Sequence, residues 1–140
     1  MRYAFPCARV LVDVRKTITE DEWLKMKEAV ENDVPLDRSY LERLFTNAVK
    51  GFKKISDDYW RIEVIREYFW HQHEENLSKD LPPMIKRLCV VKKGQLEKQI
   101  GDYFKVDLGD GDVRIVGVLY RGAKVGDTVM VHHGYAVEKI

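Results

Sequence analysis

Two adjacent prolines, Pro82 and Pro83, divide the chain into two segments with different hydrophobic periods. Proline lacks the backbone N–H that a helix interior requires, so no helix is expected to continue through this pair. Before the prolines, apolar residues recur at spacings of three and four, which is typical of amphipathic helices. After them the spacing becomes two, which is typical of strands. The sequence therefore predicts an α+β protein, with a helical domain over residues 1–83 and a β domain over residues 84–140.

About three helices and a short strand are predicted before the prolines. Thr19 and Glu22 have the spacing of a capping box, and Asp37 is a favourable N-cap residue. The predicted elements are a short strand over Arg9 to Val14 and helices over Glu20 to Glu31, from Asp37 to about Phe52, and over Asp57 to Ser78. The last helix carries a second apolar stripe. This stripe predicts a further contact, either with the β domain or with a second copy of the chain in a homodimer.

After the prolines, the period of two predicts a small antiparallel barrel. Asp110-Gly111 has the composition of a tight hairpin turn, so the acidic run Asp107 to Asp112 is interpreted as a turn rather than a calcium loop. The predicted strands cover Arg87 to Val91, Tyr103 to Leu108, Val113 to Tyr120 and Thr128 to His132, and a period-2 pattern resumes at Tyr135.

The charge balance and the cysteine content limit the classes of partner and compartment. The chain has 24 basic and 23 acidic side chains, a net charge of +1, so no strong field attracts it to nucleic acid or anionic lipid. No apolar run approaches the ~18 residues of a membrane span. Two cysteines and no secretory signal favour a reducing compartment, and we expect a cytoplasmic protein with neither a membrane nor a nucleic-acid partner.

Cys89 and His132 are the candidate metal ligands. His132 ends a predicted strand, and the first and last strands of a closed barrel can be neighbours, so both side chains can reach one rim. A thiolate and a neutral imidazole suit iron or zinc. The alternative is that Cys89 is a small buried apolar residue and His132 a hydrogen-bonded residue at a strand end.

Other reactive side chains carry weaker signals. His71 and Glu75 share a helical face, a spacing that a solvated helix end explains better than a metal site. Cys7 has no neighbouring cysteine and is interpreted as structural. The sequence contains no phosphate-binding loop, dinucleotide fingerprint, nucleophile elbow or zinc-protease motif, so we do not expect an enzyme.

Three segments of the second half resemble one known family. The stretch Val125 to Ala136, VGDTVMVHHGYA, resembles the closing signature V-x-V-H-x-G-F/Y-A of the HypC/HupF family of hydrogenase maturation chaperones. Cys89 to Leu96 is similar to the opening of that family, with lysine in place of a proline before Gly94, and Phe104 to Val118 is similar to its first hairpin. The resemblance covers Leu88 to Ile140.

The resemblance implies a fold, a function and partners. Members of the family are small OB-like barrels that work with a HypD-type scaffold on the iron group of nickel–iron hydrogenases and deliver it to the large subunit. The iron-binding cysteine of the family matches Cys89 and its functional histidine matches His132, although the family cysteine follows the initiator methionine whereas Cys89 lies inside this chain. The expected function is therefore that of an accessory protein of hydrogenase maturation that carries iron. The alternative is a protein-interaction module on the same barrel without metal chemistry.

Overall fold

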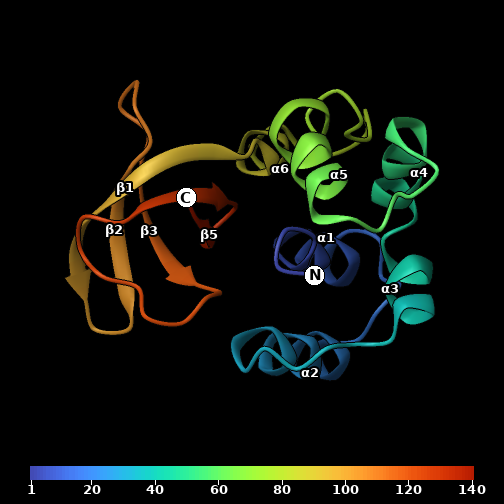
Figure 1. The fold of residues 1–140 in the computed structure, drawn as a ribbon, viewed down its shortest axis with the longest axis horizontal. Coiled ribbons are helices and arrows are strands. Elements are labelled where there is room, and N and C mark those ends of the chain that lie inside the picture. The colour runs from blue at the N-terminus through green and yellow to red at the C-terminus, as the bar shows by residue number, and fades with distance from the viewer. The chain divides into compact units, whose positions relative to one another are not determined.

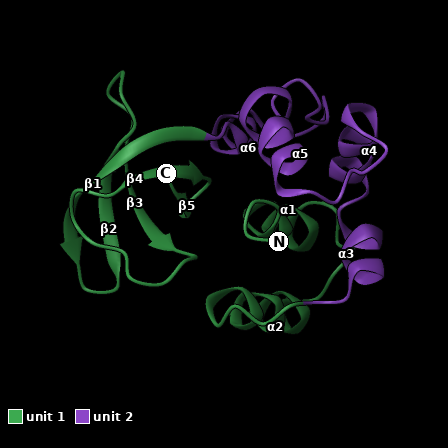
Figure 2. Cartoon of the chain, viewed as in Figure 1, with its two compact units in different colours: residues 1–35, 92–140 green, residues 36–91 purple.

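The computed structural model describes all 140 residues and contains six α-helices and a closed five-stranded barrel (Figure 1). The α+β class and the small barrel are thus confirmed. The chain forms two compact units, which Figure 2 shows in two colours. We call residues 1–35 and 92–140 the barrel unit, and residues 36–91 the helical unit. This division differs from the predicted boundary between residues 83 and 84, because the N-terminal helices belong to the same unit as the barrel.

The N-terminal segment of the barrel unit is helical. It consists of a 3₁₀ turn, η1 (Phe5–Cys7), followed by helices α1 (Ala8–Asp13) and α2 (Glu20–Glu31). The predicted strand over Arg9 to Val14 is wrong. Pro6 occupies the first turn of η1, a position that favours helix initiation. In addition, the guanidinium of Arg9 donates to the carboxylate of Asp13, a pair that only a helical spacing brings together.

Helix α2 has the predicted bounds and the predicted capping box. The Thr19 hydroxyl accepts a hydrogen bond from the backbone N–H of Glu22 at 3.2 Å, and the Glu22 carboxylate accepts one from the N–H of Thr19 at 2.7 Å. Two backbone donors that a helix start leaves exposed are therefore satisfied.

The barrel closes in the order β1-β2-β3-β5-β4, with β4 pairing back to β1. All pairs are antiparallel except β3 with β5, which is parallel, so the prediction of a wholly antiparallel barrel is wrong at that pair. Asp110 and Gly111 both have positive φ, which confirms the tight turn between β2 and β3. The strands are β1 (Lys92–Ile100), β2 (Tyr103–Asp107), β3 (Val113–Val118), β4 (Thr128–His132) and β5 (Tyr135–Lys139).

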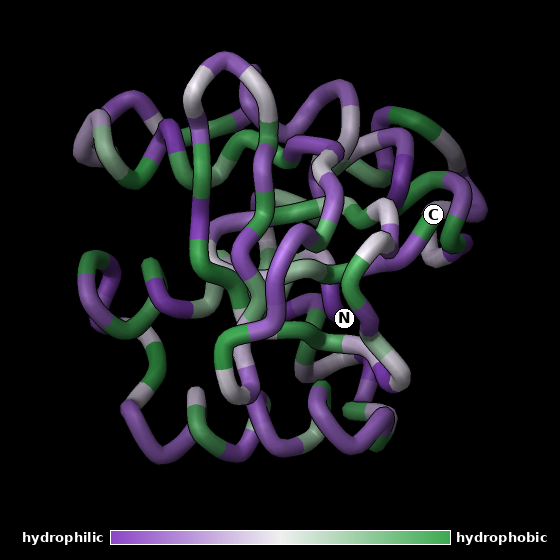
Figure 3. Tube along the Cα trace, turned by 90° about the vertical axis from the view of Figure 1, so that its left-hand side faces the viewer, coloured by the Kyte–Doolittle hydropathy of each residue, from purple (hydrophilic) through white to green (hydrophobic).

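Alternate residues of the strands point into the barrel and form its core. Hydrophobic and hydrophilic residues alternate along the strands in Figure 3, as a sheet with one buried face requires. Gly94 lies where β1 passes close to β2, because a Cβ there would be 2.6 Å from the carbonyl oxygen of Asp107. The core side chains are Leu96, Phe104, Val106, Leu108, Val116, Val129, Val131 and Ala136.

The helical unit differs from the sequence prediction at three places. The predicted second helix is broken at Phe45, whose φ of −102° and ψ of 47° are not helical, and the predicted third helix starts only after the extended residue Arg61. The predicted strand over Arg87 to Val91 is wrong, because Pro83 starts a helix at a position where proline is favoured. The elements are α3 (Arg38–Leu44), α4 (Thr46–Ile55), α5 (Ile62–Glu67), the π-helical turn η2 (Tyr68–Gln72) and α6 (Pro83–Cys89). None of the helices combines the length and the apolar character that a membrane span requires.

Candidate metal centre

His132 ends strand β4, as predicted, and its ring is fully buried. Its Nδ1 lies 2.7 Å from the backbone carbonyl oxygen of Tyr3. A carbonyl oxygen only accepts hydrogen bonds, so Nδ1 carries the proton and donates it. The lone pair of the neutral ring is therefore on Nε2. A histidine held through one nitrogen by a backbone carbonyl, with its lone pair on the other nitrogen, is the usual arrangement of a metal-binding imidazole.

Cys7 supplies a sulfur atom next to this nitrogen. Its Sγ lies 3.3 Å from Nε2 of His132, although 125 positions separate the two residues in the sequence. The helical turn η1 places the cysteine there, because it ends at Cys7 and its start is tied to the backbone of Met1. The interpretation of Cys7 as a purely structural residue missed this proximity. No local spacing marks it, since the partner lies at the other end of the chain.

His133 is the third member of the group. It lies in the two-residue turn between β4 and β5 with a φ of 53°, and its ring is buried. The rings of His132 and His133 have their centroids 5.2 Å apart. The ligand atoms of these two histidines and of Cys7 all lie within 4.8 Å of one another. We call Cys7, His132 and His133 the donor cluster; all three belong to the barrel unit.

An ion-pair network fixes the backbone of His133. Arg114 donates from Nη1 to the carbonyl oxygen of His133 at 3.1 Å. The other nitrogens of its guanidinium donate to both carboxylate oxygens of Asp112, at 3.0 and 2.8 Å, and Lys92 donates to the same carboxylate at 2.9 Å. These bonds from Arg114 and Lys92 hold the pKa of Asp112 far below its usual range. Arg114 is therefore anchored on one side and holds the turn of the donor cluster on the other.

The chemistry and the spacing of the donor cluster fit a transition-metal ion. One thiolate and two imidazoles are ligands that zinc and iron accept. In a tetrahedral site with ordinary bond lengths, a sulfur and a nitrogen ligand lie about 3.6 Å apart, and two nitrogens somewhat closer. The 3.3 Å between Cys7 and His132 is already near this value. The Cys/His cluster can thus hold a metal ion after small side-chain movements, and the donor types alone do not choose between iron and zinc.

Cys89, the other predicted ligand, is the last residue of α6 and belongs to the helical unit. It precedes Lys92, the first residue of β1, by three positions, and Lys92 pairs with Val131, the neighbour of His132. Three residues of chain span at most about 11 Å. The covalent chain therefore limits how far Cys89 can lie from the end of β1, although Cys89 is not part of the first strand as the sequence had predicted.

The other histidines do not extend the cluster. His71 and Glu75 are exposed, in agreement with a solvated helix end. His73 is buried in the helical unit, where Nδ1 lies 3.4 Å from the hydroxyl of Tyr68 and the ring packs on Phe69. Its surroundings are those of a core residue.

The sequence was compared with protein-family models and with curated proteins. No protein-family model matches the chain, and no curated protein matches its sequence. The resemblance of residues 88–140 to the HypC/HupF family therefore stays a prediction, and the donor cluster has to be interpreted on its own geometry.

Proposed function

We propose that the protein binds one transition-metal ion at the donor cluster and works as an accessory protein of nickel–iron hydrogenase maturation. The observation that carries the metal-binding part is the pair formed by Cys7 Sγ and His132 Nε2 at 3.3 Å, with the opposite nitrogen of His132 held by the carbonyl of Tyr3. A half-buried sulfur beside a fully buried, oriented imidazole offers a metal ion one soft and one borderline donor.

The donor cluster suits a site that passes its metal on. Cys7, His132 and His133 supply three donors, so a four-coordinate ion keeps one position for another ligand. In the proposed function the iron group is cargo, and the open position accepts ligands of the group or a donor from the partner. Cys89, which matches the iron-binding cysteine of the family, is a proposed donor on the resemblance alone.

The hydrogenase part of the proposal rests on the resemblance and on where its residues fall. His132, which matches the functional histidine of the family signature, is also a member of the donor cluster. A closed five-stranded barrel with the strand order found here is compatible with the OB-like fold of that family. The proposed partners are a HypD-like scaffold or the precursor of a hydrogenase large subunit, in the cytoplasm, and the proposal involves no enzymatic reaction of this protein.

A protein-interaction module without metal is the second candidate function. The bond between His132 and the carbonyl of Tyr3 favours it, because this bond ties the N-terminal segment to β4 whether or not a metal is present. In this case the donor cluster only stabilises the barrel unit, and partner binding is independent of Cys7.

The experiment is anaerobic purification from cells that express the hydrogenase maturation proteins, followed by iron analysis and infrared spectroscopy. Wild type is compared with Cys7→Ala, Cys89→Ala and His132→Ala, and with His71→Ala as a control at an exposed histidine. We expect iron, and bands in the CO and cyanide stretching region, in wild type and in the control, with loss of both in Cys7→Ala and His132→Ala. Iron-free wild type that still copurifies with a maturation protein would support the interaction module instead. Copurification with none of these proteins would contradict the hydrogenase part of the proposal. The metal-binding part would then depend on the iron content alone.

A further inference from the structure

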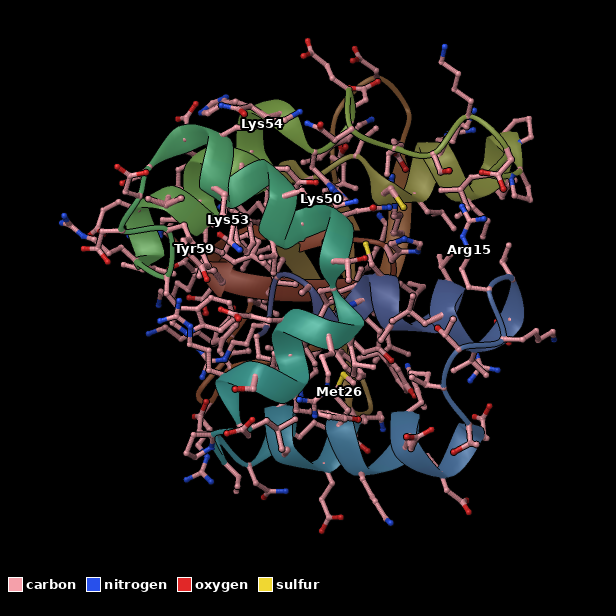
Figure 4. The ribbon with its side chains drawn as sticks, turned by 90° about the vertical axis from the view of Figure 1, so that its right-hand side faces the viewer. Arg15, Met26, Lys50, Lys53, Lys54 and Tyr59 are labelled. Atoms are coloured by element: carbon pink, nitrogen blue, oxygen red, sulfur yellow. The ribbon has the colours of Figure 1, made fainter.

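A basic pocket in the helical unit shares no residue with the donor cluster. Its volume is about 510 Å³, and the residues that line it include three lysines but no acidic side chain. Figure 4 labels the three lysines along helix α4. We call this site the lysine pocket; its lining residues are Asn47, Lys50, Gly51, Lys53, Lys54, Asn76 and Ser78.

The pocket is formed where one face of α4 lies beside the segment that follows η2. Asn47, Lys50, Gly51 and Lys54 recur at helical spacing and so share a face of α4. Gly51 is buried, and a Cβ at its position would be only 2.0 Å from Cε2 of Tyr68. The absence of a side chain therefore lets η2 pack closely against α4, and the chain beyond η2 brings Asn76 and Ser78 to the lysine face.

The lysines of the pocket are not neutralised by carboxylates. Lys50 and Lys54 are exposed and form no ion pair with an acidic side chain within 4 Å, and Lys53 lies over the ring of Tyr59 at 5.1 Å. Lys53 and Lys54 are in the last turn of α4, where the helix dipole favours a positive charge. Lys50 lies a turn earlier and has no such compensation. Three positive charges on one wall repel one another, and a bound anion would remove this repulsion.

The acidic residues near the pocket in the sequence form no ion pair with its lysines, although Asp80 bonds to the lining residue Ser78. Asp58 is paired with Arg61, and Asp80 accepts the hydroxyl proton of Ser78 at 2.6 Å. Neither Glu74 nor Glu75 lines the pocket. The neutral lining groups add hydrogen-bond donors. Asn76 is oriented by a 2.7 Å bond from its Nδ2 to the carbonyl of Gln72, and it retains its second N–H.

We propose that the lysine pocket binds a soluble small molecule that carries a phosphate group. Lysine is a common phosphate ligand, and a phosphate has enough charge and oxygen atoms to engage several ammonium and amide donors at once. The volume is in the range of small-molecule sites, roughly 300–1,000 Å³. The net charge of +1 gives no long-range attraction for a polyanion, so a compact ligand is favoured over a nucleic acid. This proposal is independent of the metal site.

The test is a titration of the protein with sodium tripolyphosphate at physiological salt, in which amide chemical shifts measured by NMR report binding. Wild type is compared with the double variant Lys50→Gln/Lys54→Gln and with Lys25→Gln, which removes a charge from the exposed face of α2. We expect saturable shifts over residues 47–54 and 76–78 in wild type and in Lys25→Gln. The double variant should bind about a hundredfold more weakly, because each of the two lost contacts to a charged group costs about a factor of ten or more. Unchanged chemical shifts elsewhere show that the double variant is folded.

Three results would overturn the proposal. Wild type without saturable binding up to about 10 mM, which is about tenfold weaker than millimolar affinity, would show that the pocket is not a phosphate site. Equal weakening in Lys25→Gln would show that only the overall charge matters. Shifts of the same residues by a short oligonucleotide at lower concentration than tripolyphosphate would identify a nucleic-acid surface instead.

Discussion

At the scale of single residues, the donor cluster depends on groups that bind no metal themselves. The carbonyl of Tyr3 sets the tautomer of His132, and the guanidinium of Arg114 holds the carbonyl of His133, whose backbone is in the left-handed region. Arg114 in turn depends on Asp112, with only 9% of either side chain exposed. The buried ion pair between Arg114 and Asp112 therefore stabilises the geometry of the donor cluster without belonging to the cluster.

Replacing Asp112 by asparagine should destabilise the barrel unit. The substitution leaves the charge of Arg114 buried without its counter-ion, and breaking such a pair costs about 3 kcal/mol. The free energy of unfolding, measured by urea denaturation, should fall by that amount. Asp110→Asn, in the same hairpin but exposed, is the control and should change it by less than about 0.5 kcal/mol. Equal effects of the two substitutions would contradict the role given to the network.

The same carboxylate should make stability depend on pH in acid. The pKa of Asp112 is lowered in the folded protein by its bonds to Arg114 and Lys92, so the unfolded chain takes up a proton first. The stabilisation is fully present above the unfolded pKa of about 4 and is lost as pH falls below it. Between pH 4 and pH 2, wild type should therefore lose more unfolding free energy than Asp112→Asn. Parallel curves for the two proteins would show that Asp112 titrates normally.

At the scale of elements, strand β1 closes the barrel by pairing on both sides. Its first half pairs with β4 and its second half with β2, and the register shifts between Leu96 and Lys98. Such a bulge bends a strand, so that one long strand can pair with β4 along its first half and with β2 along its second half. Gly94 lies in the half that pairs with β4, at the point where no side chain fits against β2.

Gly94→Ala should therefore weaken the barrel more than an ordinary glycine substitution. The added Cβ would lie 2.6 Å from the carbonyl oxygen of Asp107, so the strands have to move apart. Overpacking of this kind costs typically about 1–3 kcal/mol in unfolding free energy. Gly134→Ala is a suitable control, because nothing lies within 4 Å of a Cβ at that position. A thermal unfolding curve of Gly94→Ala that overlays wild type would show that the close approach of β1 and β2 is unimportant.

Helix α2 provides a second test at this scale. Thr19→Ala removes the acceptor for the N–H of Glu22 and should lower the unfolding free energy by about 1 kcal/mol. Thr19→Ser keeps a hydroxyl and should restore most of the loss, as measured by urea denaturation. A serine variant as unstable as the alanine variant would argue against the capping box.

The elements that the sequence predicted correctly are those with local signals. Helix α2 begins at a capping box, strand β4 has its predicted bounds, and the turn at Asp110-Gly111 follows from its composition. The strand predicted over Arg87 to Val91 is wrong, because a short apolar alternation fits a strand as well as a helix turn. Pro83, in the first turn of α6, favours the helix. Propensity over six or seven residues is too weak to settle such cases.

At the scale of the whole molecule, the two ends of the chain build the site together. Cys7 comes from the N-terminal helical segment and the histidines from the last hairpin, and the barrel unit contains both. His132 was predictable, because it follows a clear strand pattern. Cys7 was not, because its proximity is a property of the tertiary fold and leaves no trace in local spacing. His133 adjoins a predicted ligand, and its orientation depends on a backbone conformation that the sequence does not reveal.

A site built from both ends should couple metal binding to the stability of the barrel unit. A ligand that binds only the folded state at a hundred times its Kd adds about 2.7 kcal/mol to the unfolding free energy. Adding zinc or ferrous ion anaerobically should therefore raise Tm in wild type and not in Cys7→Ser, and a chelator should reverse the rise. Equal Tm changes in both proteins would place the metal elsewhere.

The central claim, a metal ion held by the donor cluster, is tested most directly by X-ray absorption spectroscopy of the protein loaded with one equivalent of metal. Zinc is the simplest probe, since its sulfur and nitrogen ligands differ in distance, about 2.3 Å against about 2.0 Å. We predict nitrogen from two imidazoles and one sulfur, with that sulfur lost in Cys7→Ala. A spectrum with oxygen and nitrogen neighbours only, unchanged in Cys7→Ala, would contradict the account.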